Sequence, residues 1–321
     1  MDQPVLEAQE PGQIVDIGGW LPHDEHGVFP VGSKPKKMLL CPDKSPFPFL
    51  IPGHKYIFKT TPGWREQQLW SEAIAYELSK LSGVAVPPCF VAIDGRTEQA
   101  GVLMEVFYGY PDERPTTRLV HGTDILQRSV PRYNPKSGRP HDVVYNVAIC
   151  RAFRIARARQ WWAQTLVFDS LIGNTDRHAE NWGLLRGTSV DPARLEWKMA
   201  PAFDNGTSLG YEILENQLEK HSTAEAVERH IMKGRHHATW QSISDTKGEP
   251  FFTLCASMFR AYPEIRGVIE RVIPTSDAPI DEIVSRCVGF DLPVRFSAAR
   301  ASFVERIIRA RRSALVSRLG L

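Results

Sequence analysis

The pattern of apolar residues changes near residue 142, and this change constrains the fold more than any other feature of the sequence. Before it, short runs of β-branched and aromatic residues are separated by prolines and glycines, as is typical of strands and turns. After it, apolar residues recur at helical spacing. The sequence therefore predicts an α+β fold in which a small β-rich lobe precedes a larger, mainly helical lobe.

The first part of the chain is expected to contain several strands and one helix. The segments that predict strands are VGSKPKKMLL (31–40), HKYIFKT (54–60), FVAI (90–93) and GVLMEVF (101–107). A helix is predicted over about 65–82, because apolar residues recur at helical spacing there and Gly83 supplies a stop. Four prolines between Pro42 and Pro52 exclude regular structure, so this segment is expected to be a surface loop.

The second part is expected to be mainly helical. Residues 108–141 hold five prolines and predict an irregular connection with one helical turn near 123–128. Asp142 is expected to cap a helix that continues, with a break near Arg159, to Leu171. A hairpin is predicted for 182–186 and 195–199. The helices expected after residue 250 are FTLCASMFRA, PEIRGVIERVI, PIDEIVSRCVG and a long closing helix around 297–318.

Composition excludes several classes of protein. The 321 residues include 39 Lys and Arg and 37 Asp and Glu, which gives a net charge of +2. A protein whose whole surface binds nucleic acid would have a much larger positive charge. The start of the chain lacks the apolar stretch of a secretory signal, and no run of about 18 apolar residues predicts a membrane span. Five scattered cysteines without a CxxC fit a reducing compartment. We therefore expect a cytoplasmic protein with no membrane contact and no direct nucleic-acid contact.

The most informative segments are VFDSLIGNTDRHAENWGLL (167–185) and APAFDNGTSLG (200–210). In the first, a polar loop with Asp176 and Asn181 follows an apolar helix. The predicted hairpin then brings Asp204, in a loop next to a glycine, back toward that polar loop. Two carboxylates and an amide oxygen suit Mg²⁺, which prefers hard oxygen ligands and keeps substrate phosphates in its shell.

Phosphoryl transfer needs further parts, and the sequence offers candidates for them. It requires a carboxylate for the attacking hydroxyl, metal ligands and a lysine that neutralises phosphate charge. Lys59 on its predicted strand is the candidate lysine, and Glu72 in the next helix is the partner that would hold it extended. The segment from Gly32 to Lys36 could cover the phosphates with backbone N–H groups and positive charge.

These motifs resemble those of HipA-type serine/threonine kinases, the toxin kinases of bacterial toxin–antitoxin systems. NTDRHAEN (174–181) and MAPAFD (199–204) are similar to the catalytic and metal-binding loops of that family. The upstream motifs follow in the family's order: a GxxPK-like phosphate loop, the strand lysine of YIFK, a helix reading E-x10-G-x3-P, and the hinge-like VLMEVF (102–107). The resemblance runs from about Val31 to Leu209.

The resemblance implies a two-lobed protein-kinase-like fold, with an N-lobe over residues 1–107 and a helical C-lobe over residues 108–321. It implies that Asp176 is the catalytic carboxylate and that Asn181 and Asp204 bind Mg²⁺. It also implies an ATP site in which Lys59 contacts the phosphates and the segment from Glu105 to Phe107 meets adenine. The ATP-site residues implied in all are Gly32, Ser33, Lys34, Lys36, Lys59, Glu72, Glu105, Phe107, His178 and Asn181.

The resemblance further implies what the protein does and which partners it has. A HipA-type kinase would transfer the γ-phosphate of ATP to a serine or threonine of a cellular, translation-related protein and so arrest growth. A small DNA-binding antitoxin would restrain it. Because few residues precede Gly32, the chain resembles the short form of the family, in which the N-terminal subdomain is a separate HipA-N-like protein or absent.

The phosphate loop departs from the family pattern at two places. Lys34 stands where a glutamine is common, and Phe29-Pro30-Val31 stand where the family often has an autophosphorylated serine. Ser33 is the only hydroxyl between Gly32 and Lys37, which makes it the candidate regulatory phosphosite. The alternative is that Ser33 only donates a hydrogen bond to a bound phosphate.

Two other functions stay open at this point. The pattern D-R-H-x-x-N also resembles the catalytic loop of phosphoinositide kinases, which leaves a lipid kinase as one alternative. A degenerate fold used as a non-catalytic binding or co-repressor module is the other. The joint presence of Lys59, Asp176, Asn181 and Asp204 argues against such decay, although a single Asp-x4-Asn spacing is a weak signal.

Three features have simpler interpretations. His178 is expected to be a structural histidine buried under the catalytic loop rather than a base or a zinc ligand. The run KGRHH (233–237) lacks the spacing of a helical metal site and is interpreted as a loop. The arginines at 151–159 and at 306–318 could meet an acidic partner or nucleic acid, but a solvated amphipathic face is the favoured interpretation.

Overall fold

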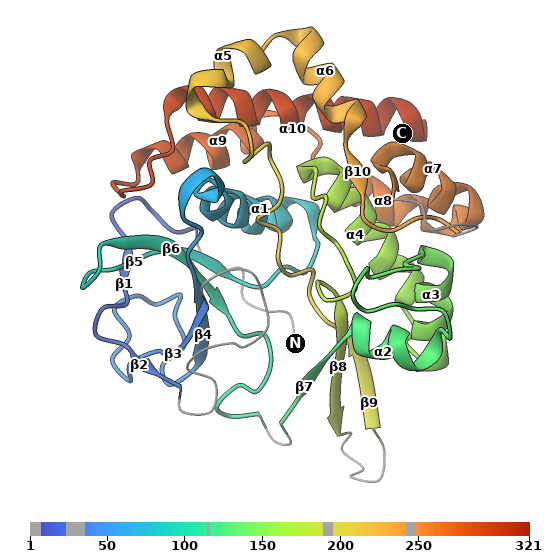
Figure 1. The fold of residues 1–321 in the computed structure, drawn as a ribbon, viewed down its shortest axis with the longest axis horizontal. Coiled ribbons are helices and arrows are strands. Elements are labelled where there is room, and N and C mark those ends of the chain that lie inside the picture. Colours follow the sequence, from blue (N-terminus) through green and yellow to red (C-terminus); the bar gives the residue numbers. More distant parts are fainter. Residues whose placement is uncertain (1–7, 24–35, 114–115, 189–194, 242–247) are drawn as a thin grey trace.

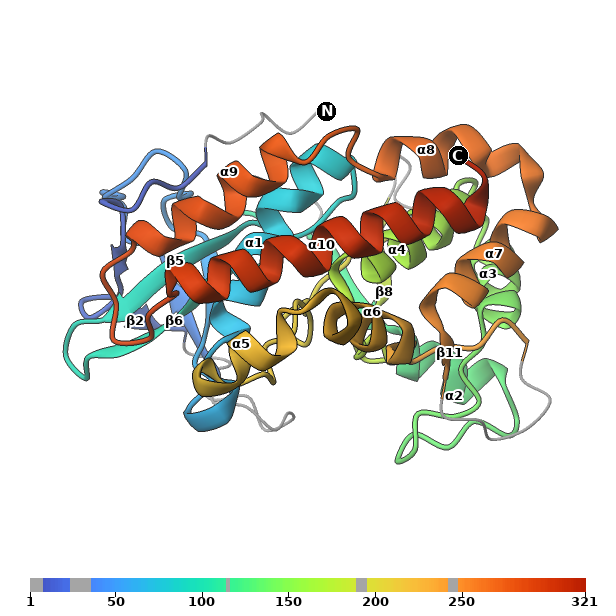
Figure 2. The ribbon, with the colours of Figure 1, turned by 90° about the horizontal axis from the view of Figure 1, so that it is seen from above.

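The computed structural model describes residues 8–23, 36–113, 116–188, 195–241 and 248–321. A twisted β-sheet formed by the first part of the chain occupies one end of the molecule, and helices fill the other end (Figure 1). The closing helix extends across the molecule, from the end with the sheet to the helical end (Figure 2). This arrangement follows the change of pattern near residue 142.

The main sheet has six strands in the order β1-β5-β6-β4-β3-β2. The strands are β1 (Val15–Asp16), β2 (Leu21–Pro22), β3 (Lys36–Leu40), β4 (Lys55–Lys59), β5 (Cys89–Asp94) and β6 (Gln99–Glu105). β1 pairs parallel to β5, and the other neighbours are antiparallel. The strands predicted at 54–60, 90–93 and 101–107 are confirmed, as is the described part of the one at 31–40. The proline-rich segment 42–52 contains no helix or strand.

A helix covers this sheet where the sequence predicts one. A short 3-10 turn, η1 (Gly63–Arg65), leads into α1 (Gln68–Ser82), whose apolar side chains Leu69, Ile74 and Leu78 are buried. Each such side chain contributes about 1.5–3 kcal/mol through burial. Gly83 ends the helix in the left-handed region, with φ of 59°, and its N–H donates to the carbonyl of Ser79.

The helical part of the chain is organised around α4. The helices are α3 (Val143–Ala152), α4 (Ala158–Ile172), α7 (Phe251–Ala261), α8 (Arg266–Val272), α9 (Ala278–Arg286) and α10 (Ala298–Leu319). α4 packs against α3, α7, α8 and α10, and its Trp162, Leu166 and Phe168 are fully buried. The side chain of Asp142 accepts the N–H of Tyr145, so the predicted cap is confirmed, and the helix break falls at 153–157.

A second, three-stranded sheet carries the loops of the candidate site. It consists of β7 (Arg118–His121), β8 (Gly183–Thr188) and β9 (Leu195–Met199), in that order. The predicted hairpin of β8 and β9 is confirmed. The helical turn predicted near 123–128 is confirmed by α2 (Gly122–Ser129), but the expectation that the rest of 108–141 is irregular is wrong, because β7 pairs with β8. A four-residue strand without alternation of buried and exposed residues leaves little local signal.

Several of the remaining elements pack against α10. The remaining elements are η2 (Glu215–Gln217), α5 (Leu218–His221), α6 (Ala224–Lys233), β10 (Arg235–His236), β11 (Glu249–Pro250), η3 (Pro263–Ile265) and η4 (Cys287–Gly289). Figure 2 shows α10 with α9 along one side and α5 and α6 along the other.

A hydrogen bond joins α1 to the chain just before α10. Trp70 of α1 donates from Nε1 to the carbonyl of Val294, and this contact ties the helix over the main sheet to the helical part of the molecule.

One arginine of α10 differs from the solvated face expected for the arginines of this helix. Arg309 forms an ion pair with Asp281 and Arg312 forms one with Asp277, and both side chains stay partly exposed. The expectation is wrong for Arg311, which is buried because it packs against the end of α4. No helix within the described residues is both long and apolar enough to cross a membrane.

Candidate active site

Lys59 lies at the end of β4, and its side chain is almost completely buried. Its Nζ atom lies 3.2 Å from Oε1 of Glu72 in α1 and 3.2 Å from Oδ1 of Asp204 in the loop after β9. Burial by itself would lower the pKa of this amine, but the charges of Asp204 and Glu72 outweigh burial and raise the pKa above its ordinary value. Lys59 is therefore a fixed cation held between the sheet, the helix and the loop.

Glu72 connects α1 to the loop that contains Asp204. One of its carboxylate oxygens faces Lys59, and the other, Oε2, accepts the backbone N–H of Asn205 at 2.9 Å. Gly206 approaches so closely that a Cβ there would lie 3.2 Å from Cγ of Glu72. Because the buried carboxylate has a charged partner and a backbone donor, a shift of α1 would move both the lysine and the loop.

Asp204 has an unusual backbone conformation. Its φ of 60° lies in the left-handed region, which costs roughly 1–2 kcal/mol for a residue with a Cβ and is tolerated best by asparagine and aspartate. Its carboxylate faces Lys59 and is about one-fifth exposed. A strained residue that the surrounding hydrogen bonds hold in place is a common property of functional loops.

The loop after α4 presents Asp176. Gly173, with φ of 72°, ends the helix, and Oδ1 of Asn174 accepts the N–H of Asp176 at 3.0 Å. Nδ2 of Asn181 donates to the carbonyl of Asp176 at 2.7 Å and so closes the loop. The carboxylate of Asp176 is 40% exposed, which leaves it accessible to an incoming group.

A buried arginine ties the two loops together. Nη1 of Arg177 donates to the carbonyl of Asn181 at 2.9 Å and also to the carbonyl of Phe203, and Nη2 donates to Oδ1 of Asn205 at 2.6 Å. Its guanidinium also binds Asp169 of α4 through two hydrogen bonds. One side chain thus fixes the 176–181 loop relative to the 203–205 segment.

The carboxylate of Asp169 completes this buried network. Burial tends to raise its pKa, but Arg177 and a hydrogen bond with His236 lower it below the ordinary value. Nε2 of His236 lies 3.2 Å from Oδ2 of Asp169. No role was predicted for these residues from the sequence. The signal that could have indicated one is a charged residue, Asp169, inside an apolar helix directly before the polar loop.

The structure places the end of β6 beside the candidate site. The ring of Phe107 stacks on that of Phe203 with a centroid separation of 5.3 Å, and Phe203 directly precedes Asp204. Glu105 is buried and accepts a hydrogen bond from the hydroxyl of Tyr110 at 2.7 Å, so a contact from Glu105 to a bound base would have to come from its backbone. Burial raises the pKa of the Glu105 carboxyl.

His178 forms hydrogen bonds within the loop but is not buried. Its Nδ1 accepts the N–H of Glu180, and its Nε2 lies 3.3 Å from Nδ2 of Asn181. Its side chain is 28% exposed, so the expectation of a histidine buried under the loop is wrong. Its ring meets that of His237 edge to face at a centroid separation of 5.8 Å, and this contact covers it only in part.

The predicted phosphate loop is described only at its end. Gly32, Ser33 and Lys34 lie outside the described residues, whereas Lys36 opens β3. Lys36 stands directly opposite Lys59 in the β3–β4 ladder, so both side chains leave the same face of the sheet.

The donor set fits a divalent cation of the Mg²⁺ type. Asp204 offers its carboxylate oxygens. Asn181 offers its amide oxygen, Oδ1, because the nitrogen of the same amide, Nδ2, is turned toward the carbonyl of Asp176 and donates to it. Arg177 holds the carbonyls of both loops. Mg²⁺ usually takes one or two protein oxygens together with water and phosphates, so this small set suffices. No cluster of three or more His, Cys, Asp or Glu that could bind a metal occurs among the described residues.

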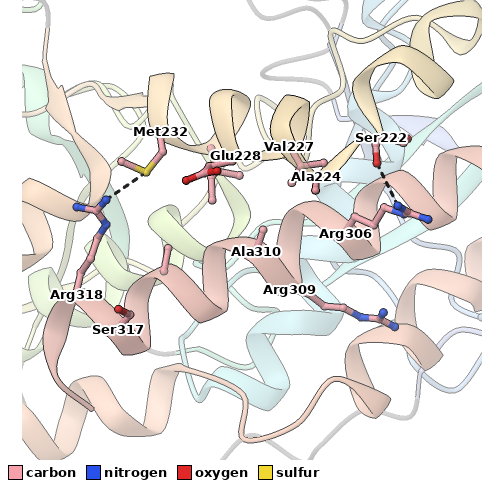
Figure 3. A pocket seen from close by; sticks show the side chains of 12 residues that line it. Ser222, Ala224, Val227, Glu228, Met232, Arg306, Arg309, Ala310, Ser317 and Arg318 are labelled. Carbon is pink, nitrogen blue, oxygen red and sulfur yellow. Dashed lines mark hydrogen bonds between the residues drawn. The ribbon is translucent and has the colours of Figure 1, made fainter.

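Two hollows on the helical part lie on either side of α6. One, of about 540 Å³, lies between α6 and α10 and is bordered by Met232, Arg306 and Arg318 (Figure 3). There Arg306 donates to the carbonyl of Ser222, and Arg318 donates to the sulfur of Met232. None of the candidate catalytic residues lines this hollow. The other is lined in part by Thr175, the residue directly before the 176–181 loop.

Comparison with known proteins identifies one family. The model of the HipA-like C-terminal domain matches residues 32–275, which include every candidate site residue described above. No curated protein matches the chain in a sequence comparison.

Two solved structures share the fold. The Helicobacter pylori proinflammatory kinase CtkA is similar with a TM-score of 0.70 and 16% identity, over 95% of this chain and 96% of that chain. The HipA of a Shewanella oneidensis MR-1 toxin–antitoxin system, solved with HipB and its operator DNA, is similar with a TM-score of 0.51 and 18% identity, over 92% of this chain and 66% of that chain. The predicted fold class, a two-lobed kinase-like α+β fold, is thereby confirmed.

Proposed function

The chain belongs to the HipA-like C-terminal domain family, and we propose that it is an ATP-dependent serine/threonine protein kinase. The observation that carries the proposal is the placement of Lys59 between Glu72 and Asp204. Phosphoryl transfer by protein kinases needs a lysine that a helix glutamate holds in place and a loop carboxylate that binds Mg²⁺, and Lys59, Glu72 and Asp204 are the residues suited to these roles. In this proposal, the lobes comprise residues 1–107 and 108–321.

In the proposed reaction, Asp176 orients the acceptor hydroxyl and takes its proton. The hydroxyl oxygen forms a bond to the γ-phosphorus of ATP while the bond to the β–γ bridging oxygen breaks, and ADP leaves. Lys59 would bind the phosphates, with Lys36 on the same face of the sheet adding positive charge. Phe107 and the backbone of Glu105 would contact adenine, and the segment from His178 to Asn181 would border the nucleotide.

Asn181 and Asp204 would hold Mg²⁺, which neutralises charge on the transferred phosphoryl group when it is bound. Arg177 is a positioning residue in this scheme. It acts by keeping the backbone of Asn181 close to that of Phe203, so that the two ligand-bearing loops stay in register. Gly32, Ser33 and Lys34 would complete the phosphate site.

We further propose that the phosphate acceptor is a cellular, translation-related protein and that a small DNA-binding antitoxin restrains the kinase in the cytoplasm. The similar Shewanella oneidensis HipA is solved with HipB and operator DNA, which supports an antitoxin partner. A separate HipA-N-like protein is a second expected partner. All five cysteines are buried free thiols, which fits a reducing compartment.

The test is transfer of labelled phosphate from ATP in the presence of Mg²⁺. Purified protein is incubated with a bacterial lysate and, separately, with phosphoinositide vesicles, with Asp176→Asn as the control. We expect label on serine or threonine of a protein, and a rate lowered by about 10²–10⁴ in the control. Label in the lipid would favour the phosphoinositide-kinase alternative, and label in neither would favour a non-catalytic binding or co-repressor module.

A further inference from the structure

A second hollow, of about 760 Å³, lies between α6 and the segment that follows Asp204. Residues 207–213 form one wall, and α5 and α6 form the other. Its floor is made by the end of α4, the glycine after α6 and Arg311 from α10. Three parts of the chain that lie far apart in sequence thus meet around one groove.

The side chains around this groove are strongly basic. Five lysines and arginines line it against one acidic residue, Glu212; the basic residues are Lys220, Arg229, Lys233, Arg235 and Arg311. Arg229 and Lys233 lie four residues apart on α6, so their exposed side chains project from the same face. Within the described part of the chain, neither forms an ion pair. We call this hollow the basic groove.

Arg311 shows that the positive charge extends into the interior. Its side chain is only 2% exposed, Nη1 donates to the carbonyl of Ser170 at 3.1 Å, and Nε has no hydrogen-bond partner among the described residues. Burial lowers the pKa of its guanidinium to about 10, and only the charge of Glu212 opposes this. A buried arginine without a neutralising partner is costly, and an anion bound in the hollow beside it would stabilise its charge.

The basic groove begins next to the proposed catalytic carboxylate. Thr175, the residue before Asp176, lines it, and its N–H donates to the carbonyl of Thr207, in the wall formed by residues 207–213. Tyr211 also lines it. Burial raises the pKa of the Tyr211 hydroxyl, and the charges of Glu212 and Asp176 raise it further. An occupant of the groove could therefore present a hydroxyl to Asp176.

We propose that the basic groove binds an acidic segment of the protein substrate, beside the serine or threonine that is phosphorylated. This proposal rests on the kinase function proposed above. Glutamate and aspartate side chains would pair with Arg229, Lys233 and Lys220 along the wall and with Arg311 at the floor. An extended peptide advances about 3.3 Å per residue, so acidic residues a few positions from the acceptor would reach these side chains. A protein segment is favoured over nucleic acid because the chain as a whole has a charge of only +2.

The test measures binding directly, so that it does not depend on catalysis. Fluorescent peptides with a central serine flanked by glutamates, or by lysines in a matched peptide, are titrated with the full chain at low salt and followed by anisotropy. The charge-reversed variant is Arg229→Glu with Lys233→Glu, both on an exposed helix face. The matched control is Arg306→Glu with Arg318→Glu, which reverses two exposed charges on the other side of α6 (Figure 3).

We expect the glutamate peptide to bind at least about tenfold more tightly than the lysine peptide. The Arg229/Lys233 variant should lose this preference or reverse it, and the Arg306/Arg318 control should keep it. Equal binding of both peptides, or the same loss in the control, would overturn the proposal. Binding of a single-stranded RNA oligomer in the absence of peptide binding would overturn it in favour of a nucleic-acid groove. If the peptide binds but no phosphate is transferred to any protein, the groove stands and the kinase function fails.

Discussion

The guanidinium of Arg177 binds both carboxylate oxygens of Asp169, with Nη2–Oδ1 and Nε–Oδ2 distances of 2.8 and 3.0 Å, and neither side chain is exposed to solvent. This bidentate pair anchors the arginine to the core helix α4. Because the same guanidinium donates to the carbonyls of Asn181 and Phe203, the pair fixes the relative position of the two loops. A charge that is buried and paired in this way is costly to leave alone.

Asp169→Asn should therefore destabilise the protein strongly. Removing one partner of a buried ion pair costs about 3–5 kcal/mol, because the other charge stays buried. Urea unfolding should show this loss in the free energy of unfolding. The control is Glu270→Gln, which breaks the exposed pair with Arg266 and should cost less than about 1 kcal/mol. Similar losses in the two variants would contradict the structural role of the buried pair.

Glu72→Gln should weaken ATP use without unfolding the protein. The amide keeps an oxygen for the N–H of Asn205 but removes the charge that faces Lys59, so Lys59 would move toward Asp204. We expect kcat/KM for ATP to fall by about 10–100-fold, which is about 1.4–2.7 kcal/mol of transition-state stabilisation. Glu77→Gln on the same helix is a suitable control, because Glu77 pairs with Lys80 rather than with Lys59. Unchanged kinetics in Glu72→Gln would remove the pair from the proposed mechanism.

The sequence predicted those elements that carry their own local signal. α1 has an apolar stripe and a terminating glycine, and the β8–β9 hairpin has two short apolar runs close together in the chain. β7 was missed, because its four residues are partly exposed and depend on pairing with β8 far along the chain. The parallel pairing of β1 with β5 could not be predicted either, because no pattern in the sequence indicates it.

The candidate site could be predicted as a set of residues but not as a network. Lys59, Glu72 and Asp204 followed from motif order, and the structure brings their side chains within hydrogen-bond distance. The role of Arg177 was not predictable, because its partners lie in three separate segments and include backbone carbonyls. Arg311 was missed for a related reason: a periodic sequence does not distinguish a buried arginine on a helix from a solvated one.

Asp204→Ala should weaken Mg²⁺-dependent ATP binding more than Asn181→Ala. A carboxylate contributes a full charge at a divalent cation, whereas an amide contributes only a dipole. Calorimetric titration of each variant with ATP, with and without Mg²⁺, measures the difference. Because Asp204 also contacts Lys59, the titration without Mg²⁺ separates the loss of the cation from a change at the lysine. Equal Mg²⁺ dependence in the wild type and Asp204→Ala would contradict the assignment.

Acid should destabilise the fold through two histidines near the 176–181 loop. Burial, and then the charge of Arg139, lower the pKa of His237 to about 3, and burial lowers that of His141 well below its ordinary value. The unfolded chain therefore binds more protons below about pH 6.5, so the free energy of unfolding falls as pH drops from there toward 3. The slope is at most about 1.4 kcal/mol per pH unit for each histidine, and smaller for His237, which is partly exposed. His237→Gln should flatten this slope in urea unfolding at several pH values, and an unchanged slope would exclude His237.

Ser33, the candidate phosphosite, lies outside the described residues. A phosphate on Ser33 would add about −1.5 to −2 charges three residues before Lys36. Lys36 stands opposite Lys59, so the new anion would compete with ATP for the same cations and would repel the triphosphate. The neighbouring Lys37 already forms an ion pair with Asp94 at 2.9 Å, so it is engaged away from the new anion. Ser33 phosphorylation is therefore expected to be an off-switch.

Ser33→Asp should lower ATP affinity by about tenfold or more, and Ser33→Ala should leave it within about twofold. If Ser33 instead donates a hydrogen bond to a bound phosphate, both variants would weaken ATP binding, since both lose the hydroxyl. Mass spectrometry of wild-type protein incubated with ATP shows whether the site is modified, and Asp176→Asn shows whether the modification is the protein's own. An unmodified Ser33 in active protein would contradict the switch, and restraint would then have to come from partner proteins.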